Sequence, residues 1–457
     1  MAFEDETVAA VATATGGRDA GRRTAPPAEP GRARRHRVLG GRAFWTLGDQ
    51  AVSSLTNAAL ALVVARSVDG ADFGAFSIAL FTFGFVLGVG RAVVCDPFVI
   101  QHSDRPGEED AAGRRQATRE ASGAAATYGV VTGLACAAAG AVLEGHAGAA
   151  LLALGISLPG LLVQDCWRYA FFAAGRPRAA AVNDVVWAVV QLAAVGALLA
   201  TGRNSVFLLT LAWGGAALVA AAVGSRQAGV LPDPRAAARW FRATRELNVR
   251  LGLDYVANMG AVNLSIYLVG AVGGLVAVGA IRAAQVLLGP LQLLFFGLSA
   301  FALPVLSPLA GSGARLRRLT ILLSGGMTLV SLAWVGTLLL LPHAVGEALL
   351  GDSWDGAWSV LLPIGVVMAA IGATTGPRVG LKALRRADLL LRVTMTHAPF
   401  ILVLGVLGAA LGGARGAAVG YAVAELVGTV LIWVVFLGAD GGHVVDVHRL
   451  PRRRAAV

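Results

Sequence analysis

The sequence has few charged residues for its length. They make up 14% of its 457 residues, whereas soluble proteins carry about a quarter. Aromatic residues are also few, at 7%, while hydrophobic residues reach 56% and the mean hydropathy is +0.69. This balance argues against a soluble protein with one large core. It favours helices that cross a membrane, each of which must be apolar over about 20 residues.

Motifs for chemistry are also lacking. The three cysteines, Cys95, Cys136 and Cys166, lie inside apolar segments and show no spacing typical of a metal site or a disulfide framework. The sequence contains no phosphate-binding P-loop and no nucleophile-elbow motif. We therefore predict no catalytic residues, no metal and no cofactor, and we expect a transporter rather than an enzyme.

Apolar segments of membrane length recur along most of the chain and predict an all-α integral membrane protein with about 12 transmembrane helices. The predicted spans are Phe44–Ala65, Gly74–Ile100, Ser122–Leu143, Ala147–Ala174, Ala179–Thr201, Ser205–Gly224, Leu251–Val272, Val276–Leu303, Leu319–Leu341, Ala357–Leu381, Leu389–Leu411 and Gly416–Leu437.

The polar stretches between these segments define the predicted domains. Residues 1–40 have no apolar core like that of a signal peptide, and they predict a disordered basic cytoplasmic tail. Six spans form an N-terminal lobe (41–224), and a cytoplasmic linker (225–250) leads to a C-terminal six-helix lobe (251–438). A second basic tail (439–457) ends the sequence.

Basic residues occur in every second connection between the predicted spans. The positive-inside rule therefore places both termini in the cytoplasm and the chain in the cell membrane. The net charge of +11 does not indicate nucleic-acid binding, because these residues form short clusters between apolar spans rather than one basic module. The acidic connection around Glu347, Asp352 and Asp355 faces outside. There, Trp354 and Trp358 predict an interfacial aromatic belt.

The two predicted lobes are weakly similar to each other. Residues 47–74 align with residues 252–279, so that Asp49 matches Asp254 and Gly74 matches Gly279. Six spans per lobe give both lobes the same orientation, which is a parallel repeat. Such a repeat predicts alternating access, with a substrate path between two lobes lined by the first, second, seventh and eighth helices.

Four motifs resemble a known family. They are 49–58 with 64–67 and 72–77 (Asp-Phe-Gly-Ala-Phe-Ser), 279–285 with Gly289-Pro290 and Leu303-Pro304, 350–357 (Leu-Gly-Asp-Ser-Trp-Asp-Gly-Ala), and 412–420 with Glu425-Leu426. In order and spacing they resemble the polysaccharide exporters of the multidrug/oligosaccharidyl-lipid/polysaccharide exporter superfamily, the type that exports O-antigen and teichoic acid.

This resemblance implies a multidrug-extruder-like fold and a function in cell-surface polysaccharide biosynthesis. The implied activity is the flipping of a lipid-linked oligosaccharide across the cell membrane. The implied partners are a polyprenyl-phosphate-linked saccharide, the lipid bilayer, and a polysaccharide polymerase or glycosyltransferases. Two alternatives stay open: an ion-coupled small-molecule extruder of the same fold, and a non-transporting scaffold for polysaccharide assembly.

Ionisable residues at membrane depth are the candidate site residues, because charge in hydrocarbon is costly. Arg91 and Arg282 are candidate contacts to a phosphate group, since the planar guanidinium binds oxygens in pairs. Asp49 and Asp254 are further candidates for the cavity. Both arginines have a structural alternative: a salt bridge with Asp49 for Arg91, and snorkelling to the outer membrane interface for Arg282.

Three residues are candidates for ion coupling. Glu425 lies in the middle of the last predicted span, His397 has a pKa suited to proton transfer, and Asp49 lies deep in the first span. Each also has a purely structural interpretation. Asp165 and Arg168, at i and i+3 on one helix, predict mutual neutralisation, and Asp184 is expected to interact with a helix N-terminus.

Overall fold

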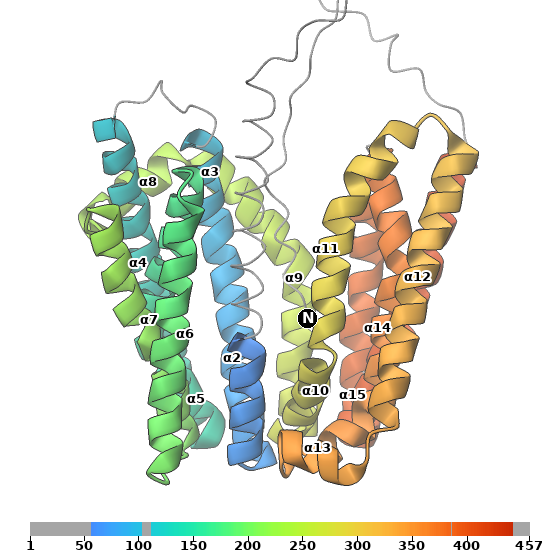
Figure 1. Cartoon of the computed structure of the whole chain (residues 1–457), viewed down its shortest axis with the longest axis horizontal. Coiled ribbons are helices and arrows are strands. Elements are labelled where there is room, and N and C mark those ends of the chain that lie inside the picture. The colour runs from blue at the N-terminus through green and yellow to red at the C-terminus, as the bar shows by residue number, and fades with distance from the viewer. Residues whose placement is uncertain (1–55, 103–110, 385, 442–457) are drawn as a thin grey trace, which may run out of the picture. The chain divides into compact units, whose positions relative to one another are not determined.

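The computed structural model describes residues 56–102, 111–384 and 386–441. Every regular element within these ranges is helical (Figure 1). After a helix over 56–67, the main helices are α2 (Gly70–Gly90), the π-helix η1 (Arg91–Cys95), α3 (Asp96–His102), α4 (Ala111–Leu143), α5 (Gly145–Ala173), α6 (Pro177–Ala200), α7 (Val206–Ala228), α8 (Ala237–Ala243), α9 (Arg245–Gly273), α10 (Leu275–Leu287), α11 (Gly289–Leu306), α12 (Gly313–Leu339), α13 (His343–Leu350), α14 (Ser353–Ala383) and α15 (Ala387–Gly441).

Many of these helices are long and apolar enough to cross a membrane. Within the described residues there are eight, or nine if α10 and the start of α11 form one bent span. The multi-pass all-helical prediction is therefore confirmed. The total of 12 spans and the side on which the termini lie stay predictions, and both tails lie outside the described residues.

α15 is a hairpin of two helices rather than one long rod. Its backbone leaves the helical region at Gly412 and Gly413, and Gly413 has a φ of +55°, which favours glycine. The two arms pack closely, since a Cβ on Gly408 would lie 2.1 Å from the carbonyl oxygen of Gly416. The break falls between the eleventh and twelfth predicted spans and separates them as expected.

The eighth predicted span, Val276–Leu303, is interrupted. α10 ends at Leu287 and α11 begins at Gly289, with Pro290 in its first turn. Proline has no backbone N–H, and its ring clashes with the preceding helical turn, so it starts a helix more easily than it continues one. The two helices together are long and apolar enough for one span, bent by 57° at the break, so the predicted span contains a kink.

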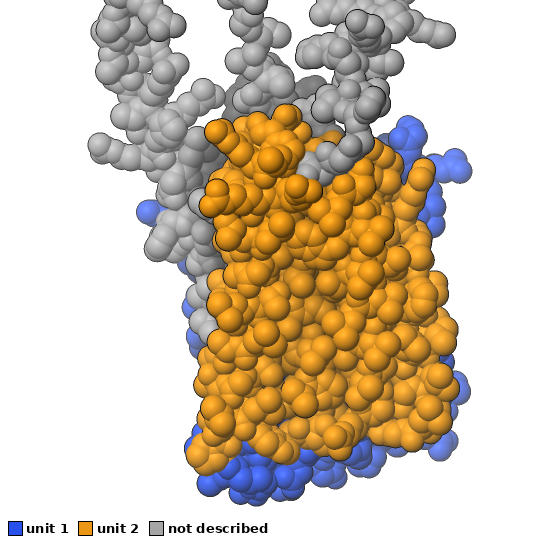
Figure 2. Space-filling view, turned by 90° about the vertical axis from the view of Figure 1, so that its right-hand side faces the viewer, with its two compact units in different colours: residues 1–286, 343–357 blue, residues 287–342, 358–457 orange. Residues whose placement is uncertain are grey.

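The chain forms two compact units, coloured separately in Figure 2. Unit 1 comprises 1–286 and 343–357, and unit 2 comprises 287–342 and 358–457. The core of unit 1 includes Trp167, Phe171 and Trp240, and a core in unit 2 includes Leu316, Ile432 and Phe436. α9 and α10 belong to unit 1, whereas the sequence grouped them with the later helices. The predicted lobes stay a prediction.

Within unit 1, α2 and α10 cross with a reciprocal contact. A Cβ on Gly74 would lie 1.9 Å from the carbonyl oxygen of Leu275, and a Cβ on Gly279 would lie 2.8 Å from that of Gly70. The predicted repeat pairs Gly70 with Leu275 and Gly74 with Gly279. Gly74 of the first segment thus contacts Leu275 of the second, and their repeat equivalents, Gly279 and Gly70, contact each other in the same way. Such reciprocal contacts are those of two segments related by a two-fold axis. The crossing therefore supports the predicted internal repeat, with glycine allowing the close approach.

Candidate functional site

Arg91 lies where the helix geometry of one membrane span changes. α2, η1 and α3 form a single span, and the backbone N–H of Asp96 donates to the carbonyl of Arg91, five residues earlier. A π-helical turn of this kind is rare, and it is frequently found at functional sites. It therefore marks this part of unit 1 as a candidate site.

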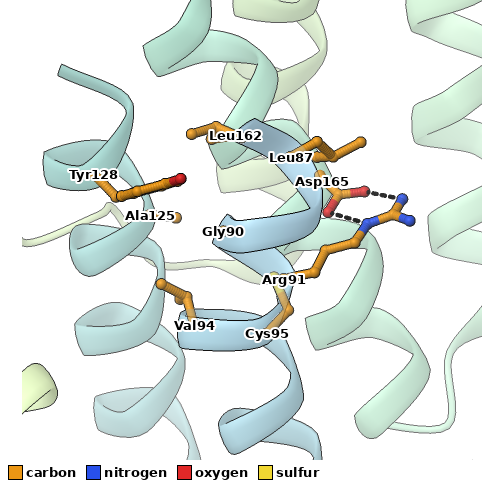
Figure 3. Close-up of a pocket in the computed structure, with 9 residues that line it drawn as sticks. All are labelled: Leu87, Gly90, Arg91, Val94, Cys95, Ala125, Tyr128, Leu162 and Asp165. Atoms are coloured by element: carbon orange, nitrogen blue, oxygen red, sulfur yellow. Dashed lines mark hydrogen bonds and ion pairs between the residues drawn. The ribbon is translucent and has the colours of Figure 1, made fainter. Parts of the chain in front are cut away.

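Arg91 forms a two-pronged ion pair with Asp165 of α5 (Figure 3). Its Nε donates to Oδ2 at 2.9 Å and its Nη2 donates to Oδ1 at 2.8 Å. The guanidinium also lies over the ring of Tyr169, 5.4 Å from the centroid. The side chains of Arg91 and Asp165 are 16% and 8% exposed, so the pair is mostly shielded from solvent.

The predicted neutralisation of Asp165 by Arg168 is wrong. Asp165 pairs with Arg91, while Arg168 reaches Asp184 of α6, with Nε 3.5 Å from Oδ2. The two side chains share one helix but contact different neighbours, because tertiary packing brings stronger partners than the i, i+3 spacing does. The alternative pair of Arg91 with Asp49 lies outside the described residues.

Asp184 belongs to a buried polar cluster that links α5, α6 and α7. Gln164 donates to Asp184 at 2.7 Å, and Asn183 donates to the carbonyl of Ala220 at 2.7 Å. Side-chain partners rather than a helix N-terminus therefore stabilise Asp184, against expectation. Gln164 and Asn183 were missed in the sequence because only ionisable residues were examined; amides inside apolar spans would have identified them.

A small cavity adjoins the Arg91–Asp165 pair. It is lined by Leu87, Gly90, Arg91, Val94, Cys95, Ala125, Tyr128, Leu162 and Asp165, and its volume is about 10 Å³. That volume holds about one water molecule. The sticks in Figure 3 show apolar side chains around most of this space, with the ion pair at one side. The cavity is too small for a sugar or a phosphate group.

Arg282 on α10 has a different environment in the same unit. Its guanidinium lies over the ring of Phe81 on α2, 5.5 Å from the centroid. The residue as a whole is partly exposed, but its Nε is buried and has no hydrogen-bond partner. One turn further along α10, Oε1 of Gln285 is also buried without a partner. In the described part of the chain no carboxylate forms an ion pair with Arg282.

Unit 2 contains a separate cluster of ionisable residues. His397, in the first arm of α15, is 5% exposed, and its Nε2 lies 3.0 Å from the carbonyl oxygen of Ala424 in the second arm. Glu425 interacts electrostatically with His397 and with Arg378 of α14. The structure thus brings together two predicted coupling residues that the sequence treated separately. Arg378 was missed, because its place near the end of a span is typical of an interfacial arginine.

The two remaining candidates have little structural description. Asp49 lies outside the described residues, and Asp254 lies on α9 with its backbone described but not its side chain. Their predicted places in a cavity stay predictions. Within the described ranges, no group of three or more His, Cys, Asp or Glu residues is arranged to hold a metal ion.

The predicted aromatic belt is wrong for one of its two tryptophans. Trp358 is 40% exposed, whereas Trp354 is 1% exposed and packs on Gly346, where a Cβ would overlap its ring. The turn between α13 and α14 is further fixed to the helix over 56–67, since Ser353 donates to the carbonyl of Ala65 at 3.1 Å. Trp354 is therefore part of the core of this turn.

The fold resembles those of solved membrane transporters. An inward-facing multidrug resistance MATE family transporter of the MOP superfamily aligns with a TM-score of 0.66 and 13% identity, over 85% of this chain and 93% of that one. The lipid II flippase MurJ in an inward closed conformation aligns with a TM-score of 0.60 and 12% identity, over 87% of this chain and 89% of that one. MATE in a bent conformation aligns with a TM-score of 0.53 and 14% identity, over 88% of this chain and 94% of that one.

No protein-family profile and no curated protein sequence matches the chain. At these identities the structural likeness shows the fold alone, and it does not distinguish multidrug transporters from flippases. Together with the apolar helices, it shows that the chain is a multi-pass membrane protein with the fold shared by MATE and MurJ transporters.

Proposed function

We propose that the chain is a transporter that flips a lipid-linked oligosaccharide across the cell membrane for polysaccharide biosynthesis. The observation that carries the proposal is Arg282, a guanidinium at membrane depth whose Nε is buried without a partner and which forms no ion pair with a described carboxylate. An arginine that has no protein anion is suited to bind an anionic ligand.

The chemistry of the proposed ligand fits this environment. A saccharide linked to a polyprenyl carrier bears phosphate or pyrophosphate, and a guanidinium binds such oxygens in pairs while keeping its charge when desolvated. A charge inside a membrane protein normally has a partner or faces a polar cavity. We assign that partner to the substrate, while the lipid tail stays in the bilayer.

Arg91 takes a secondary place in this proposal. Its guanidinium is bound at two points by Asp165, so a phosphate would have to displace a carboxylate to reach it. Asp49 and Asp254 stay candidates for the same cavity. The mechanism we propose is alternating access, in which the repeat-related helices of the two lobes line the path.

We further propose that transport is coupled to an ion, with His397 and Glu425 as the binding residues and Asp49 as an additional candidate. A carboxylate and an imidazole from facing arms of one hairpin can share a proton. This cluster is also the observation that favours the second candidate function, an ion-coupled extruder of small molecules. A non-transporting scaffold has no need of ionisable residues at this depth.

The test is a deletion strain complemented at equal expression with wild type, Arg282→Gln or Arg282→Lys. The outcome measured is the accumulation of undecaprenyl-linked saccharide on the inner leaflet. We expect Arg282→Gln to accumulate the precursor as the deletion does, and the exposed control Arg317→Gln to behave as wild type. Normal export by Arg282→Gln would disprove the phosphate contact. If the deletion strain itself accumulated no more precursor on the inner leaflet than wild type, the small-molecule extruder or the scaffold would be favoured instead.

We propose that both termini lie in the cytoplasm, because basic residues recur in alternate connections. Reporter fusions at the C-terminus and after Asp355 are expected to report opposite compartments. A shared compartment would contradict this orientation. The proposed partners, a glycosyltransferase or a polysaccharide polymerase, follow from the resemblance to the polysaccharide exporters and not from the orientation.

A further inference from the structure

The segment between α7 and α9 is an amphipathic element with one face buried in unit 1. It consists of the short 3₁₀-helix η2 (Pro234–Ala236) and α8. Ala236, Ala237 and Trp240 are 1%, 4% and 4% exposed, and Trp240 packs into the core that contains Trp167 and Phe171. The apolar face of this segment therefore already has its partner within the protein.

The opposite face consists of arginine. Arg235, Arg239 and Arg242 follow the spacing i, i+4, i+7, which places them on one side of a helix. All three are exposed, and together with Ala243 they line an open hollow of about 560 Å³. Three exposed guanidinium groups therefore gather around this open hollow, one of them paired with Glu120.

Nearby acids do not neutralise this surface. Residues 111–120 and 226–250 contain nine arginines and only three acids. Each acid is paired with one arginine: Glu120 with Arg239 at 3.0 Å, Asp233 with Arg119 at 3.5 Å, and Glu246 with Arg250 at 2.7 Å. Arg235 and Arg242 have no carboxylate partner in the described part of the chain, so the surface keeps a large excess of positive charge.

The segment is held firmly against α4. The backbone N–H of Asp233 donates to the carbonyl of Arg119 at 3.2 Å, and a Cβ on Gly123 would lie 2.0 Å from the carbonyl oxygen of Asp233. Such a contact is possible only because residue 123 is glycine. The arginines therefore project from a fixed backbone, which lowers the entropy lost when they bind a ligand.

We propose that the arginine face of η2 and α8 binds the phosphate headgroup of an anionic membrane lipid that is not the transported substrate. An amphipathic helix with a basic polar face is typical of binding at a bilayer surface, and each arginine near an anionic surface adds to the attraction. Exposed apolar side chains flank the segment: Leu231, before η2, is 73% exposed, and Val249, on α9, is 52% exposed. They suit contact with lipid rather than with a soluble phosphate.

The experiment measures lipid affinity directly. Full-length protein in detergent is titrated with phosphatidylglycerol or phosphatidylcholine, and native mass spectrometry gives the apparent Kd of each lipid. The variant Arg235→Gln/Arg242→Gln leaves the Arg239–Glu120 pair intact. It removes two exposed side chains, of which Arg242 donates only to the carbonyl of Ala238 within its own helix among the described residues. We expect about a tenfold weaker affinity for phosphatidylglycerol, with phosphatidylcholine unchanged.

A matched control distinguishes loss of this site from a general loss of two positive charges. Arg315, Arg317 and Arg318 at the start of α12 are also exposed. We expect Arg317→Gln/Arg318→Gln to keep the phosphatidylglycerol affinity within about twofold. Equal weakening in both variants, or none in the α8 variant, would overturn the proposal. Complete displacement of phosphatidylglycerol by inorganic phosphate at constant ionic strength would also overturn it, in favour of a soluble phosphate ligand.

Discussion

Arg91 and Arg282 are the same residue type in the same unit, at membrane depth, and they have opposite environments. Arg91 is bound at two points by Asp165, whereas Arg282 lies over an aromatic ring with its Nε unpaired. Along the span formed by α2 and η1, Phe81 and Arg91 are ten residues apart, which is roughly 15 Å. The two cations therefore lie at different depths. Arg91 links two helices through its ion pair, whereas Arg282 forms no ion pair with a described carboxylate.

Membrane depth alone therefore does not identify a substrate contact. Removing one partner of a buried ion pair leaves an uncompensated charge and is strongly destabilising. Removing a partly buried charge that has no protein partner removes a cost of desolvation instead. Stability measurements can therefore distinguish the two roles without any transport assay.

The largest effect is expected for Asp165→Asn. The substitution keeps the shape of the side chain but removes the negative charge opposite Arg91, and we expect the free energy of unfolding to fall by about 3 kcal/mol. Thermal unfolding in detergent measures it. In the double variant Arg91→Gln/Asp165→Asn most of the loss should be recovered, because no unpaired charge is left.

The control for this experiment is Asp233→Asn, which removes a more exposed pair with Arg119 at 3.5 Å. Its effect is expected to stay below about 1 kcal/mol. If Asp165→Asn were as mild as Asp233→Asn, the contrast between a structural and a free arginine would disappear.

A smaller effect is expected for Phe81→Leu. The change removes the aromatic face under the Arg282 guanidinium, and the cation–π contribution is about 0.5–2 kcal/mol. A double-mutant cycle with Arg282→Gln isolates that contribution from the lost volume. The control is Phe73→Leu, at a buried phenylalanine of the same helix, and it should show no coupling to Arg282. Coupling as large as that of Phe81→Leu would mean that the cycle measures general packing.

Arg282→Gln by itself is expected to change stability by less than about 1 kcal/mol, because the lost cation–π contact with Phe81 is offset by the removed cost of burying a charge without an ion-pair partner. The same variant should abolish export. Thermal unfolding of the purified variant in detergent tests the first statement, and the precursor assay in the complemented deletion strain tests the second. A loss of stability as large as that of Asp165→Asn would show that Arg282 also has a structural partner.

The smallest effect on stability is expected for the exposed pair of His343 with Asp355. The hydrogen bond to Asp355 at 2.9 Å, and the neighbouring Glu347, raise the pKa of His343 above its ordinary value. Because the folded pKa exceeds the unfolded one, the stabilisation is complete below about pH 6.5 and is lost as the pH rises through the folded pKa.

We therefore expect wild type to melt slightly above His343→Gln at pH 5.5, with the difference gone by pH 9. Thermal unfolding of both proteins across this range provides the measurement. A difference that grows with pH would have the wrong sign and would exclude this assignment for His343.

Several features of the site could be anticipated from particular residues. Arg91, Arg282, His397 and Glu425 were selected as ionisable residues inside predicted spans, and the structure gives each a specific ionic, polar, aromatic or electrostatic interaction. The glycine pair of the repeat, Gly74 and Gly279, was selected by alignment and meets at the crossing of α2 and α10. The role of these residues in transport is still a proposal.

The sequence by itself determined that this chain crosses the membrane many times, because an apolar run of about 20 residues is a local property. The turn at Gly412–Gly413 and the break before Pro290 follow equally local rules of backbone conformation, although only the first was foreseen. These features depend on neighbours along the chain.

Tertiary structure alone decided which charge meets which. Arg91 and Asp165 are 74 residues apart, and no spacing rule connects them, whereas the pair predicted by spacing, Asp165 with Arg168, is not formed. The same holds for Arg282 over Phe81. Side-chain pairing between helices depends on how their faces pack, and a residue at i+3 cannot compete with a two-pronged partner on the facing helix, because paired hydrogen bonds to a charge are the stronger interaction.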